Sequence, residues 1–456
     1  MKSADVNDMD AINVAGIDLG TSNSLIAVLN QHAETVVLAA DKNAKDLDGR
    51  RESDSGSLST GTLLPSAVAL IDSEEEEEVV LVGDSALEFW AKNKNSGSTI
   101  PNVLITKLTV AHVSLEKAPL FVPCIKALLG KSFEEACREA SRQGILLNSP
   151  DSKKNIERKA YPVDFVASHI IKNLIERASN LNAAVMTIPA NSQPKQAEQT
   201  IAAGKMAGLD KIALLQEPVA AALAYGTEWL NDEHQVITVL DIGAGTTDVS
   251  FVESWSGIIE IISTAAANVG GRDLDLKMAK IIKEKLEVQH QIIRSEFELL
   301  SHARKAKEAL SENDEITLSF EDCSITISTV EFESSVEDII DQIQECILHA
   351  AADAAIELPN VGLEGAIPVT KLVLVGGSSY VPSIRRRAEF ITNLTHDGTL
   401  SPMEVVARGA CVYAGILAGK IKDFKPRIPI LNVCPIGLTE LRNHVRAAAL
   451  ADPNES

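Results

Sequence analysis

The residues best suited to chemistry lie in a glycine-rich stretch near the middle of the chain, residues 236–252. Two apolar runs rich in β-branched side chains flank a turn of glycine, alanine and threonine, which predicts two strands joined as a hairpin. Gly243 and Gly245 can adopt positive φ, and successive backbone N–H groups that point into one concavity bind phosphate oxygens. Asp241 closes the first strand and could hold a metal ion or its waters. The alternative interpretation is an ordinary hairpin in a sheet.

The same pattern occurs a second time near the start of the chain, in residues 14–30. An apolar run ends in an Asp-Leu-Gly sequence that contains Asp18, a turn with Thr21 and Ser22 follows, and a second apolar run returns. Two copies in one chain predict duplicated lobes that face each other across a cleft. Because a buried acid needs a partner, Asp18 and Asp241 at the ends of their strands are candidates for binding a metal ion.

The composition restricts the class of protein. With 456 residues the chain is long enough for two or three domains, and 45% hydrophobic but only 4% aromatic residues predict aliphatic cores. A formal net charge of −22 argues against a nucleic-acid surface, which needs clustered Lys and Arg. The polar first residues, the lack of a long apolar window and six scattered cysteines favour a cytoplasmic protein with reduced thiols and no membrane association.

Strands alternate with helices along most of the chain. We expect helices at residues 133–143, 163–181, 196–207, 219–225, 274–286, 295–310, 336–356, 382–390 and 402–417. We expect further strands at residues 183–189, 212–215, 315–320, 324–328 and 371–375. Such alternation, with glycine turns at the carboxyl ends of strands, predicts an α/β architecture whose ligand binds where those strands end.

A third glycine turn, Gly376-Gly377-Ser378, follows the strand at 371–375. The first two turns could clamp phosphates from opposite lobes, while the third lets the backbone approach a flat ring or a ribose closely. Taken together in this order, the three turns resemble the pattern of the actin-like ATPase superfamily, which includes sugar kinases, actin and chaperone ATPases.

More specific motifs occur in the order of one branch of that superfamily. They are Leu-Pro-Ser-Ala-Val at 64–68, Val-Gly-Asp-Ser-Ala at 82–86, Lys-Ala-Leu-Leu-Gly-Lys at 126–131, Glu-Pro-Val-Ala-Ala-Ala-Leu-Ala-Tyr-Gly at 217–226 and Val-Gly-Gly-Arg-Asp at 269–273. These motifs resemble the nucleotide-binding domain of the seventy-kilodalton heat-shock chaperone family, and the resemblance covers about residues 13–423.

The resemblance implies a two-lobed actin-like ATPase fold, in which duplicated ribonuclease H-like lobes surround a nucleotide cleft. Lobe I would comprise residues 13–232 and lobe II residues 233–398, and residues 399–423 would form a helix that returns to lobe I. Residues 424–456 would be a linker-like segment and the truncated start of a substrate-binding domain. The implied cofactors are ATP or ADP with Mg²⁺.

The resemblance also implies a catalytic set: Asp18, Lys126, Glu217, Asp241 and Thr246. The three acids Asp18, Glu217 and Asp241 would hold Mg²⁺ through water, and Glu217 would also orient the attacking water. Lys126 would stabilise charge on the γ-phosphate, with Lys107 as a weaker candidate for that lysine. These groups suit phosphoryl transfer, in which catalysis is mainly alignment and charge stabilisation. As the structural alternative, Glu217 would only be a carboxylate at a helix start.

The implied nucleotide-binding set is Gly20, Thr21, Ser22, Gly243, Ala244, Gly245, Gly270, Gly271, Lys307, Ser311, Gly376, Gly377, Ser378 and Tyr380. The chain departs from the family pattern on the adenosine side. Arg304 stands where the family usually has an acid, and Glu308 and Tyr380 stand where it has the two arginines that sandwich adenine. Tyr380 could still stack on the base. Lys195 replaces a family arginine and cannot reproduce its planar fork.

We therefore expect a divergent chaperone-type protein that binds ATP, hydrolyses it slowly and assists protein folding through partners. The partners implied are a J-domain co-chaperone, a nucleotide-exchange factor or a ribosome-associated complex. Residues 429–438 resemble the family's interdomain linker, and the sequence after them is too short for a peptide-binding sandwich, so clamping of peptides by this chain is not expected. The alternatives are a nucleotide-dependent scaffold without turnover and a small-metabolite kinase of the same superfold.

Overall fold

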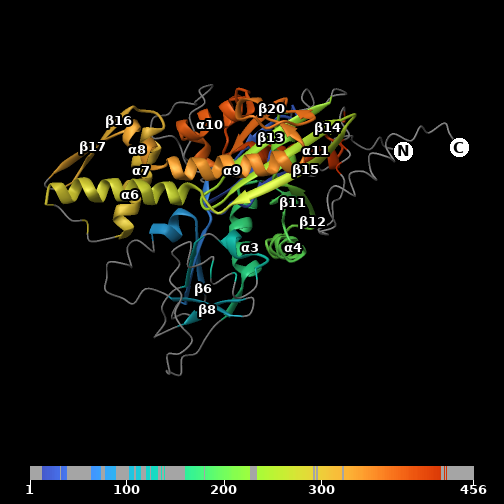
Figure 1. Ribbon diagram of the computed structural model, residues 1–456. Coiled ribbons are helices and arrows are strands. Elements are labelled where there is room, and N and C mark those ends of the chain that lie inside the picture. The colour runs from blue at the N-terminus through green and yellow to red at the C-terminus, as the bar shows by residue number, and fades with distance from the viewer. Residues whose placement is uncertain are drawn as a thin grey trace, which may run out of the picture. The chain divides into compact units, whose positions relative to one another are not determined.

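The computed structural model describes residues 13–30, 32–38, 63–72, 78–88, 102–106, 109–113, 120–123, 125–131, 160–178, 180–225, 234–290, 296–320 and 323–422, and a few isolated positions. Figure 1 labels their helices and strands. Contacts divide the chain into two units. Unit 1 comprises Met1–Ala224 and Val406–Lys425, and unit 2 comprises Tyr225–Val405 and Pro426–Ser456.

The main sheet of unit 1 has the strand order β12-β11-β1-β2-β3. Its strands are β1 (Asn13–Asp18), β2 (Asn23–Leu29), β3 (Thr35–Val37), β11 (Leu181–Ile188) and β12 (Lys211–Gln216). β1 runs antiparallel to β2 and parallel to β11, which in turn runs parallel to β12. The short β4 (Leu64–Pro65) pairs with β2. Because β1 and β11 carry continuous apolar runs, they suit the middle of a sheet that is covered on both faces.

Helices cover this sheet and connect its parallel strands. They are α3 (Val163–Ile175), α4 (Pro194–Met206), α5 (Glu217–Ala224) and α11 (Val405–Leu417). α4 connects β11 to β12, as a parallel pair requires. Two smaller sheets complete the unit, with orders β6-β5-β9 and β10-β8-β7. Their strands are β5 (Ala67–Asp72), β6 (Glu78–Val82), β7 (Asn102–Thr106), β8 (Thr109–Val113), β9 (Leu120–Pro123) and β10 (Ala160–Pro162).

Two glycines bring α11 into backbone contact with its neighbours in unit 1. A Cβ on Gly16 of β1 would lie 2.1 Å from the backbone nitrogen of Cys411 in α11. A Cβ on Gly409 of α11 would lie 1.7 Å from the backbone oxygen of Ala220 in α5. No side chain fits at either position, so these glycines set how closely α11 approaches β1 and α5.

The sheet of unit 2 repeats the first half of this arrangement. Its order is β15-β14-β13-β20, with β13 (Gln235–Ile242), β14 (Thr247–Trp255), β15 (Ile258–Ala267) and β20 (Lys371–Val375). β13 is antiparallel to β14 and parallel to β20, just as β1 is antiparallel to β2 and parallel to β11. This confirms the α/β architecture and the duplication that the repeated aspartate-glycine pattern predicts.

The remaining elements of unit 2 surround one aliphatic core cluster. They are α6 (Gly271–Val288), α7 (Glu296–Leu310), β16 (Glu315–Ser319), β17 (Ser324–Ser328), α8 (Thr329–Ser335), α9 (Glu337–Asp353), β18 (Ile356–Glu357), η3 (Pro359–Val361), β19 (Ile367–Pro368), η4 (Gly377–Tyr380) and α10 (Pro382–Thr392). α9 packs on β14 and β15, and β16 pairs with β17 as the expected hairpin.

Several sequence predictions about elements differ from the structure; among them, the helix expected at 163–181 ends at Ile175 as α3. Strand β15 was not predicted, because its run of small residues after Ile262 hides the alternation of a strand. The helix expected at 336–356 is present as α9 (Glu337–Asp353), but α8 (Thr329–Ser335), which precedes it, was not expected; Val336 between the two helices has a non-helical ψ. The helix expected from residue 402 begins at Val405. Most of the helix expected at 133–143 lies outside the described residues.

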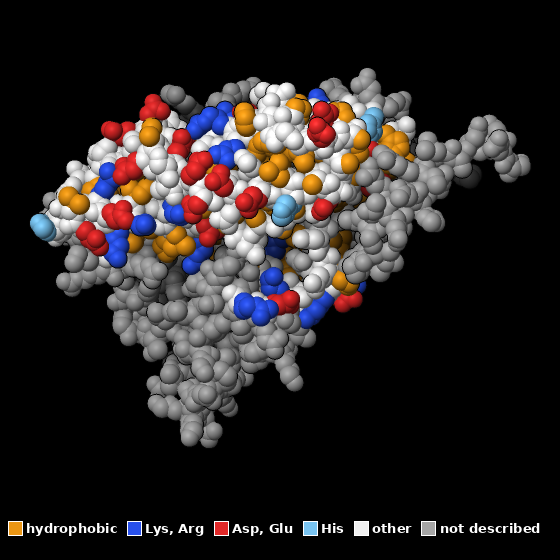
Figure 2. All heavy atoms as spheres, viewed as in Figure 1, with side chains coloured by type: hydrophobic (Ala, Val, Ile, Leu, Met, Phe, Trp, Pro, Cys, Tyr) orange, Lys and Arg blue, Asp and Glu red, His pale blue; other side chains and the backbone are white. Residues whose placement is uncertain are grey.

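Charges of both signs are mixed over the face that Figure 2 shows. Several ion pairs join different helices of unit 2: Lys277–Asp338 at 2.8 Å, Lys285–Glu331 at 3.0 Å and Arg386–Glu333 at 2.7 Å. Exposed pairs of this kind stabilise a fold by about 0–1 kcal/mol each, so the apolar core carries most of the stability. Among the described residues, no helix is both long and apolar enough to cross a membrane.

The contact between Gly409 and Ala220 generates a prediction. Replacing Gly409 by Ala should lower the free energy of unfolding by about 3 kcal/mol, because the added methyl group overlaps a backbone oxygen that can move only with α5. Chemical denaturation followed by circular dichroism measures this change. Gly398→Ala is the control, because a Cβ at Gly398 meets nothing within 4 Å. Equal denaturation midpoints for the two variants would contradict the close approach.

Candidate functional site

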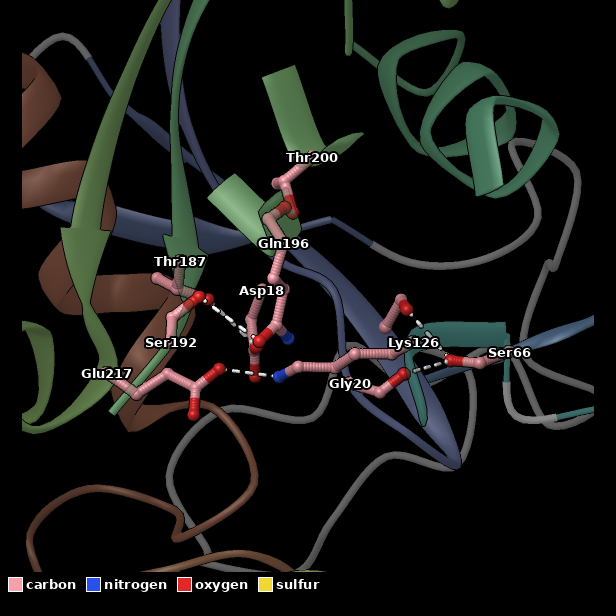
Figure 3. Close-up of polar contacts among 10 residues, drawn as sticks. Asp18, Gly20, Ser66, Lys126, Thr187, Ser192, Gln196, Thr200 and Glu217 are labelled. Atoms are coloured by element: carbon pink, nitrogen blue, oxygen red, sulfur yellow. Dashed lines mark hydrogen bonds and ion pairs between the residues drawn. The ribbon is translucent and has the colours of Figure 1, made fainter. Parts of the chain in front are cut away.

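Asp18 is the first element of the candidate site in unit 1. It is the last residue of β1, and the parallel register of β1 with β11 brings it beside Thr187. The Thr187 hydroxyl donates a hydrogen bond to Asp18 Oδ1 at 3.0 Å (Figure 3). Burial raises the pKa of the Asp18 carboxyl from 3.8 to about 6; nearby Lys126 opposes this, Glu217 adds to it, and the Thr187 bond opposes it. The fold thus holds a partly desolvated carboxylate at the end of a strand.

Lys126 and Glu217 form an ion pair beside Asp18. Lys126 is on η1 (Ile125–Leu128), and Glu217 is the first residue of α5. Lys126 Nζ lies 2.5 Å from Glu217 Oε1, and each side chain is 13% exposed. Figure 3 shows the lysine amine and both carboxylates converging on one place. The three groups that the sequence nominated from positions far apart in unit 1 are therefore brought together.

The turn that follows Lys126 is attached to α4. Gly130 has a φ of 77°, and a Cβ there would lie 2.6 Å from the Cβ of Gln196. The backbone N–H of Gly130 donates to Gln199 Oε1 at 2.6 Å, and Lys195 Nζ donates to the backbone oxygen of Lys131 at 3.2 Å. These contacts fix the chain that carries Lys126.

The turn between β1 and β2 is the phosphate-type turn expected near the start of the chain. A Cβ on Gly20 would lie 2.0 Å from the backbone oxygen of Asn23, so the turn has this tight shape only with glycine. Ser66 Oγ donates to the Gly20 oxygen at 2.7 Å, and the Ser66 N–H donates to the Ser22 oxygen at 2.8 Å (Figure 3). Thr21 and Ser22 are partly exposed, so their polar groups remain accessible.

In unit 2, the hairpin between β13 and β14 turns through residues 243–246. The Gly243 N–H donates to the Thr246 oxygen at 2.9 Å, which closes the turn. Asp241 is directly opposite Asp248 in the strand register, and both are partly exposed. Thr246 is also partly exposed, at the end of the turn nearest Asp248. The hairpin thus presents backbone N–H groups, carboxylates and a hydroxyl on one short segment.

Two other glycine-containing turns of unit 2 meet this hairpin. The Gly271 N–H donates to the Gly243 oxygen at 2.9 Å, and a Cβ on Gly270 would lie 2.8 Å from the Gly245 nitrogen. Ser378 Oγ donates to the same Gly243 oxygen at 3.2 Å. Of the three turns expected to converge, the hairpin turn and the turn after β20 are therefore in contact within unit 2; together with the start of α6, which was not one of those three turns, they form what we call the glycine junction.

Gly376 and Ala244 complete this junction. Gly376 has a φ of 83°, and a Cβ there would lie 2.3 Å from the Ile242 oxygen and 2.9 Å from Asp241 Oδ1. The Arg272 N–H donates to the Ala244 oxygen at 2.7 Å. Gly377 follows and begins η4, which leads to Tyr380.

α7 contributes the polar groups that the sequence assigned to the nucleoside. Lys307 Nζ lies 2.7 Å from Asp275 Oδ1 of α6 and donates to the Gly271 oxygen at 3.2 Å. Ser311, one turn further, donates from Oγ to the Lys307 oxygen at 3.3 Å. Tyr380 is 37% exposed, and its hydroxyl lies 3.0 Å from Ser401 Oγ. Lys307 thus adjoins the glycine junction, Ser311 is hydrogen-bonded to the backbone of the same helix, and Tyr380 is exposed to water.

Sequence reasoning missed several residues that position this site. Thr187 and Ser66 hold the Asp18 strand end and the Gly20 turn, and Asp275 holds Lys307. Thr187 could have been found from the register of two parallel strands, since it follows the apolar run of β11 at the same sheet edge. Asp275 could not, because its pairing depends on how α6 and α7 pack. Lys107, the weaker lysine candidate, lies outside the described residues.

The donor groups suit a magnesium nucleotide. Carboxylate oxygens and the waters they hold are the ligands that Mg²⁺ prefers; Asp18 and Glu217 supply carboxylates in unit 1, and Asp241 supplies one in unit 2. At the glycine junction of unit 2, a Cβ on Gly376 or Gly270 would collide with backbone atoms of the hairpin, so the close approach of these turns requires glycine. Among the described residues, no group of three or more His, Cys, Asp or Glu side chains is close enough to hold a metal ion directly.

Comparison with known proteins identifies the family of sequences that share these motifs. The family model "Hsp70 protein" matches residues 119–449. Chaperone protein DnaK of Guillardia theta is 29% identical over 93% of the chain, that of Trieres chinensis is 30% identical over 93%, and that of Thermus thermophilus is 29% identical over 93%. The chain covers 62%, 64% and 63% of these relatives, and so spans about three fifths of their length.

The raised pKa of Asp18 predicts how its charge affects stability. The folded pKa of about 6 exceeds the unfolded value of 3.8, so ionising Asp18 costs folding free energy as pH rises from about 4 through 6. Asp18→Asn should therefore stabilise the ligand-free protein by about 1–2 kcal/mol at pH 7.5, which is less than the full shift implies because Asp18 keeps some contact with water. At pH 4 the gain should vanish.

Denaturant titrations at the two pH values measure this difference. Asp210→Asn is the matched control, because Asp210 is exposed and also belongs to unit 1. A variant at Asp18 that is as stable as the parent at pH 7.5, or that gains equally at pH 4, would show that the carboxylate is not held out of water.

The backbone of Gly376 gives a second prediction for the site. Its φ of 83° with ψ of 156° lies in a region that essentially only glycine adopts, and a Cβ would also overlap the Ile242 oxygen. Gly376→Ala should therefore cost about 3 kcal/mol of unfolding free energy, from strain and overlap together. At Gly377 a Cβ meets only the flexible Met403 sulfur, at 3.0 Å. Gly377→Ala should cost clearly less, and similar thermal midpoints for both variants would refute this account of the junction.

Proposed function

Because the chain belongs to the Hsp70 family, we propose that it is a chaperone-type protein that binds Mg·ATP, hydrolyses it slowly and acts in protein folding through partner proteins. The observation that carries the enzymatic part is the grouping of Asp18, Lys126 and Glu217 at one place in unit 1. Two acids and one lysine beside a hydroxyl-rich turn supply what phosphoryl transfer requires of a protein.

The residues of unit 1 would act on the reacting end of the nucleotide. When bound, Mg²⁺ neutralises charge on the phosphates. Asp18 would hold waters of the metal shell, and binding of the cation would favour its ionised form, which folding alone disfavours. Glu217 would orient the attacking water at the start of α5. Lys126 would turn its ammonium from Glu217 towards the γ-phosphate and stabilise the charge that develops there.

Within unit 2, the glycine junction and α7 would also bind a nucleotide. The N–H groups of the hairpin turn and the start of α6, an 18-residue helix, are suited to phosphate oxygens. Asp241 and Thr246 would serve the metal waters and the terminal phosphates. The nucleoside would lie against Ser378, Ser311 and the open face of Tyr380, with Lys307 beside the ribose.

The partners belong to the proposal as well. J-domain proteins, nucleotide-exchange factors and ribosome-associated complexes are the classes implied by the resemblance, and residence in the cytoplasm fits them. The chain matches about three fifths of the length of each DnaK relative, and these partner classes are proposed for that matched part.

A scaffold without turnover is the second candidate, and one observation favours it. Glu308 is exposed on α7 and Tyr380 is exposed on η4, at the two positions where the resemblance leads us to expect arginines around adenine. An adenine base stacked on one tyrosine ring lacks the cation–π interactions that arginines would provide. The bound nucleotide could then stabilise the structure without being hydrolysed. Hydrolysis measurements separate the two candidates.

Single-turnover hydrolysis of radiolabelled ATP tests the enzymatic proposal. Lys126→Ala and Glu217→Gln should each lower the rate by about 100-fold, the usual loss when one group that stabilises the transition state is removed. Asp18→Asn should reduce the increase in the hydrolysis rate that added Mg²⁺ produces. Lys172→Ala, an exposed lysine of α3, is the control and should hydrolyse ATP like the parent.

Two outcomes would overturn parts of this proposal. Phosphate release that is unchanged in the combined Asp18→Asn, Lys126→Ala variant would remove hydrolysis by this site and leave the scaffold. A purified J-domain protein added to the same assay should accelerate the parent and not the Lys126→Ala variant. No acceleration by any J-domain protein would count against that class of partner.

A further inference from the structure

One buried acid holds two cations of the neighbouring helix in unit 2. Asp275 of α6 lies 2.7 Å from Lys307 Nζ and 3.6 Å from Arg304 Nε, both on α7. The Asp275 and Lys307 side chains are 8% and 10% exposed, whereas the Arg304 side chain is 56% exposed. With two positive charges against one negative, the cluster keeps one positive charge, and Arg304 is the member that water reaches.

This cluster adjoins the glycine junction. Lys307 Nζ is bound to the Gly271 oxygen, and a Cβ on Gly271 would lie 3.5 Å from Lys307 Nζ and 2.6 Å from Ser378 Oγ. Arg304 shares Asp275 with Lys307 and precedes it by three residues, so both lie on the side of α7 that faces the start of α6. The exposed guanidinium of Arg304 is therefore next to the place proposed for the nucleoside, and the exposed carboxylate of Glu308 follows it by one turn of the same helix.

Arg304 retains most of its hydrogen-bonding capacity. A guanidinium has five N–H donors, and the ion pair of Arg304 with Asp275 involves Nε at a long distance of 3.6 Å. Lys307 in contrast is held tightly and is almost enclosed. An incoming anion would thus meet the planar fork of Arg304, which matches two phosphate oxygens at once.

We propose that Arg304 makes this chain selective for a nucleotide whose ribose carries an additional phosphate on its 2′- or 3′-oxygen. Ribose hydroxyls are donors and are matched by an acid, whereas an arginine at the same edge accommodates a phosphate, as dinucleotide-binding folds illustrate. The proposal rests on the nucleotide binding proposed above and names the substrate class of that site. The ligand class is a purine nucleoside 5′-diphosphate or 5′-triphosphate phosphorylated on its ribose.

Isothermal titration calorimetry of the full chain with Mg²⁺ tests this selectivity. The ligands are ADP, 2′-phospho-ADP and 3′-phospho-ADP. At least one phosphorylated form should bind about tenfold more tightly than ADP, which is the gain expected of one charge-assisted contact. Arg304→Glu should abolish or reverse that preference, and Arg304→Lys should retain only part of it because it lacks the fork.

Lys305→Glu is the matched control. Lys305 is the next residue of α7, is exposed, and its replacement changes the net charge by the same amount. This variant should keep the parent's preference. If Arg304→Glu and Lys305→Glu lose the preference for phosphorylated ADP to the same extent, the proposal is overturned. The preference would then come from the overall electrostatic potential of the surface and not from a direct contact with Arg304.

Two further outcomes have different meanings. If the parent binds ADP as tightly as both phosphorylated forms, the selectivity is refuted while the proposed nucleotide binding stands. If the parent binds none of the three, nucleotide binding itself is refuted, and the selectivity with it. Circular dichroism of each variant confirms that it is folded before the affinities are compared.

Discussion

Direct contact between backbones, with no side chain in between, is the constraint on which the candidate site residues of each unit depend. In unit 2 the junction of three turns exists because Gly270, Gly271 and Gly376 let peptide groups approach within a hydrogen-bond distance of the β13–β14 hairpin. In unit 1 the same device operates away from the ligand groups, where α11 touches β1 and α5 through Gly16 and Gly409. The glycines thus fix the positions of neighbouring peptide groups, as close packing fixes side chains in a core.

In unit 1, the burial of the Asp18 carboxylate is electrostatically unfavourable. Folding encloses Asp18, raises its pKa to about 6 and places it near a second carboxylate, Glu217. Thr187 and Lys126 offset part of this cost. Without a ligand, the protein with an ionised Asp18 has a lower free energy of unfolding than a variant with a neutral side chain at this position would have. A divalent cation bound beside Asp18 would relieve this cost, and binding and stability would then be coupled at this carboxylate.

Much of the fold and part of the site follow from local sequence. The hairpin at Asp241, the turn after β1 and most helices could be predicted because apolar periodicity and glycine placement act over a few residues. Nomination of Lys126 and Glu217 needed the family resemblance, since nothing in their spacing brings residues 91 positions apart together. Strand β15 and the bond between Thr187 and Asp18 were missed, as were the contacts of Asp275 with α7. Each of these depends on register or helix packing, which single-sequence patterns do not encode.

The ion pair between Lys126 and Glu217 has a consequence for which molecules can enter unit 1 at all. Asp18, Glu217 and Lys126 together carry one net negative charge when all are ionised. A bare anion such as sulfate would meet Lys126 already paired with Glu217 and a further acid, Asp18, beside the pair. A ligand that brings its own divalent cation would supply the missing positive charge and could compete for Glu217. The charges of these three residues therefore favour a phosphate bound to a metal ion over a bare one.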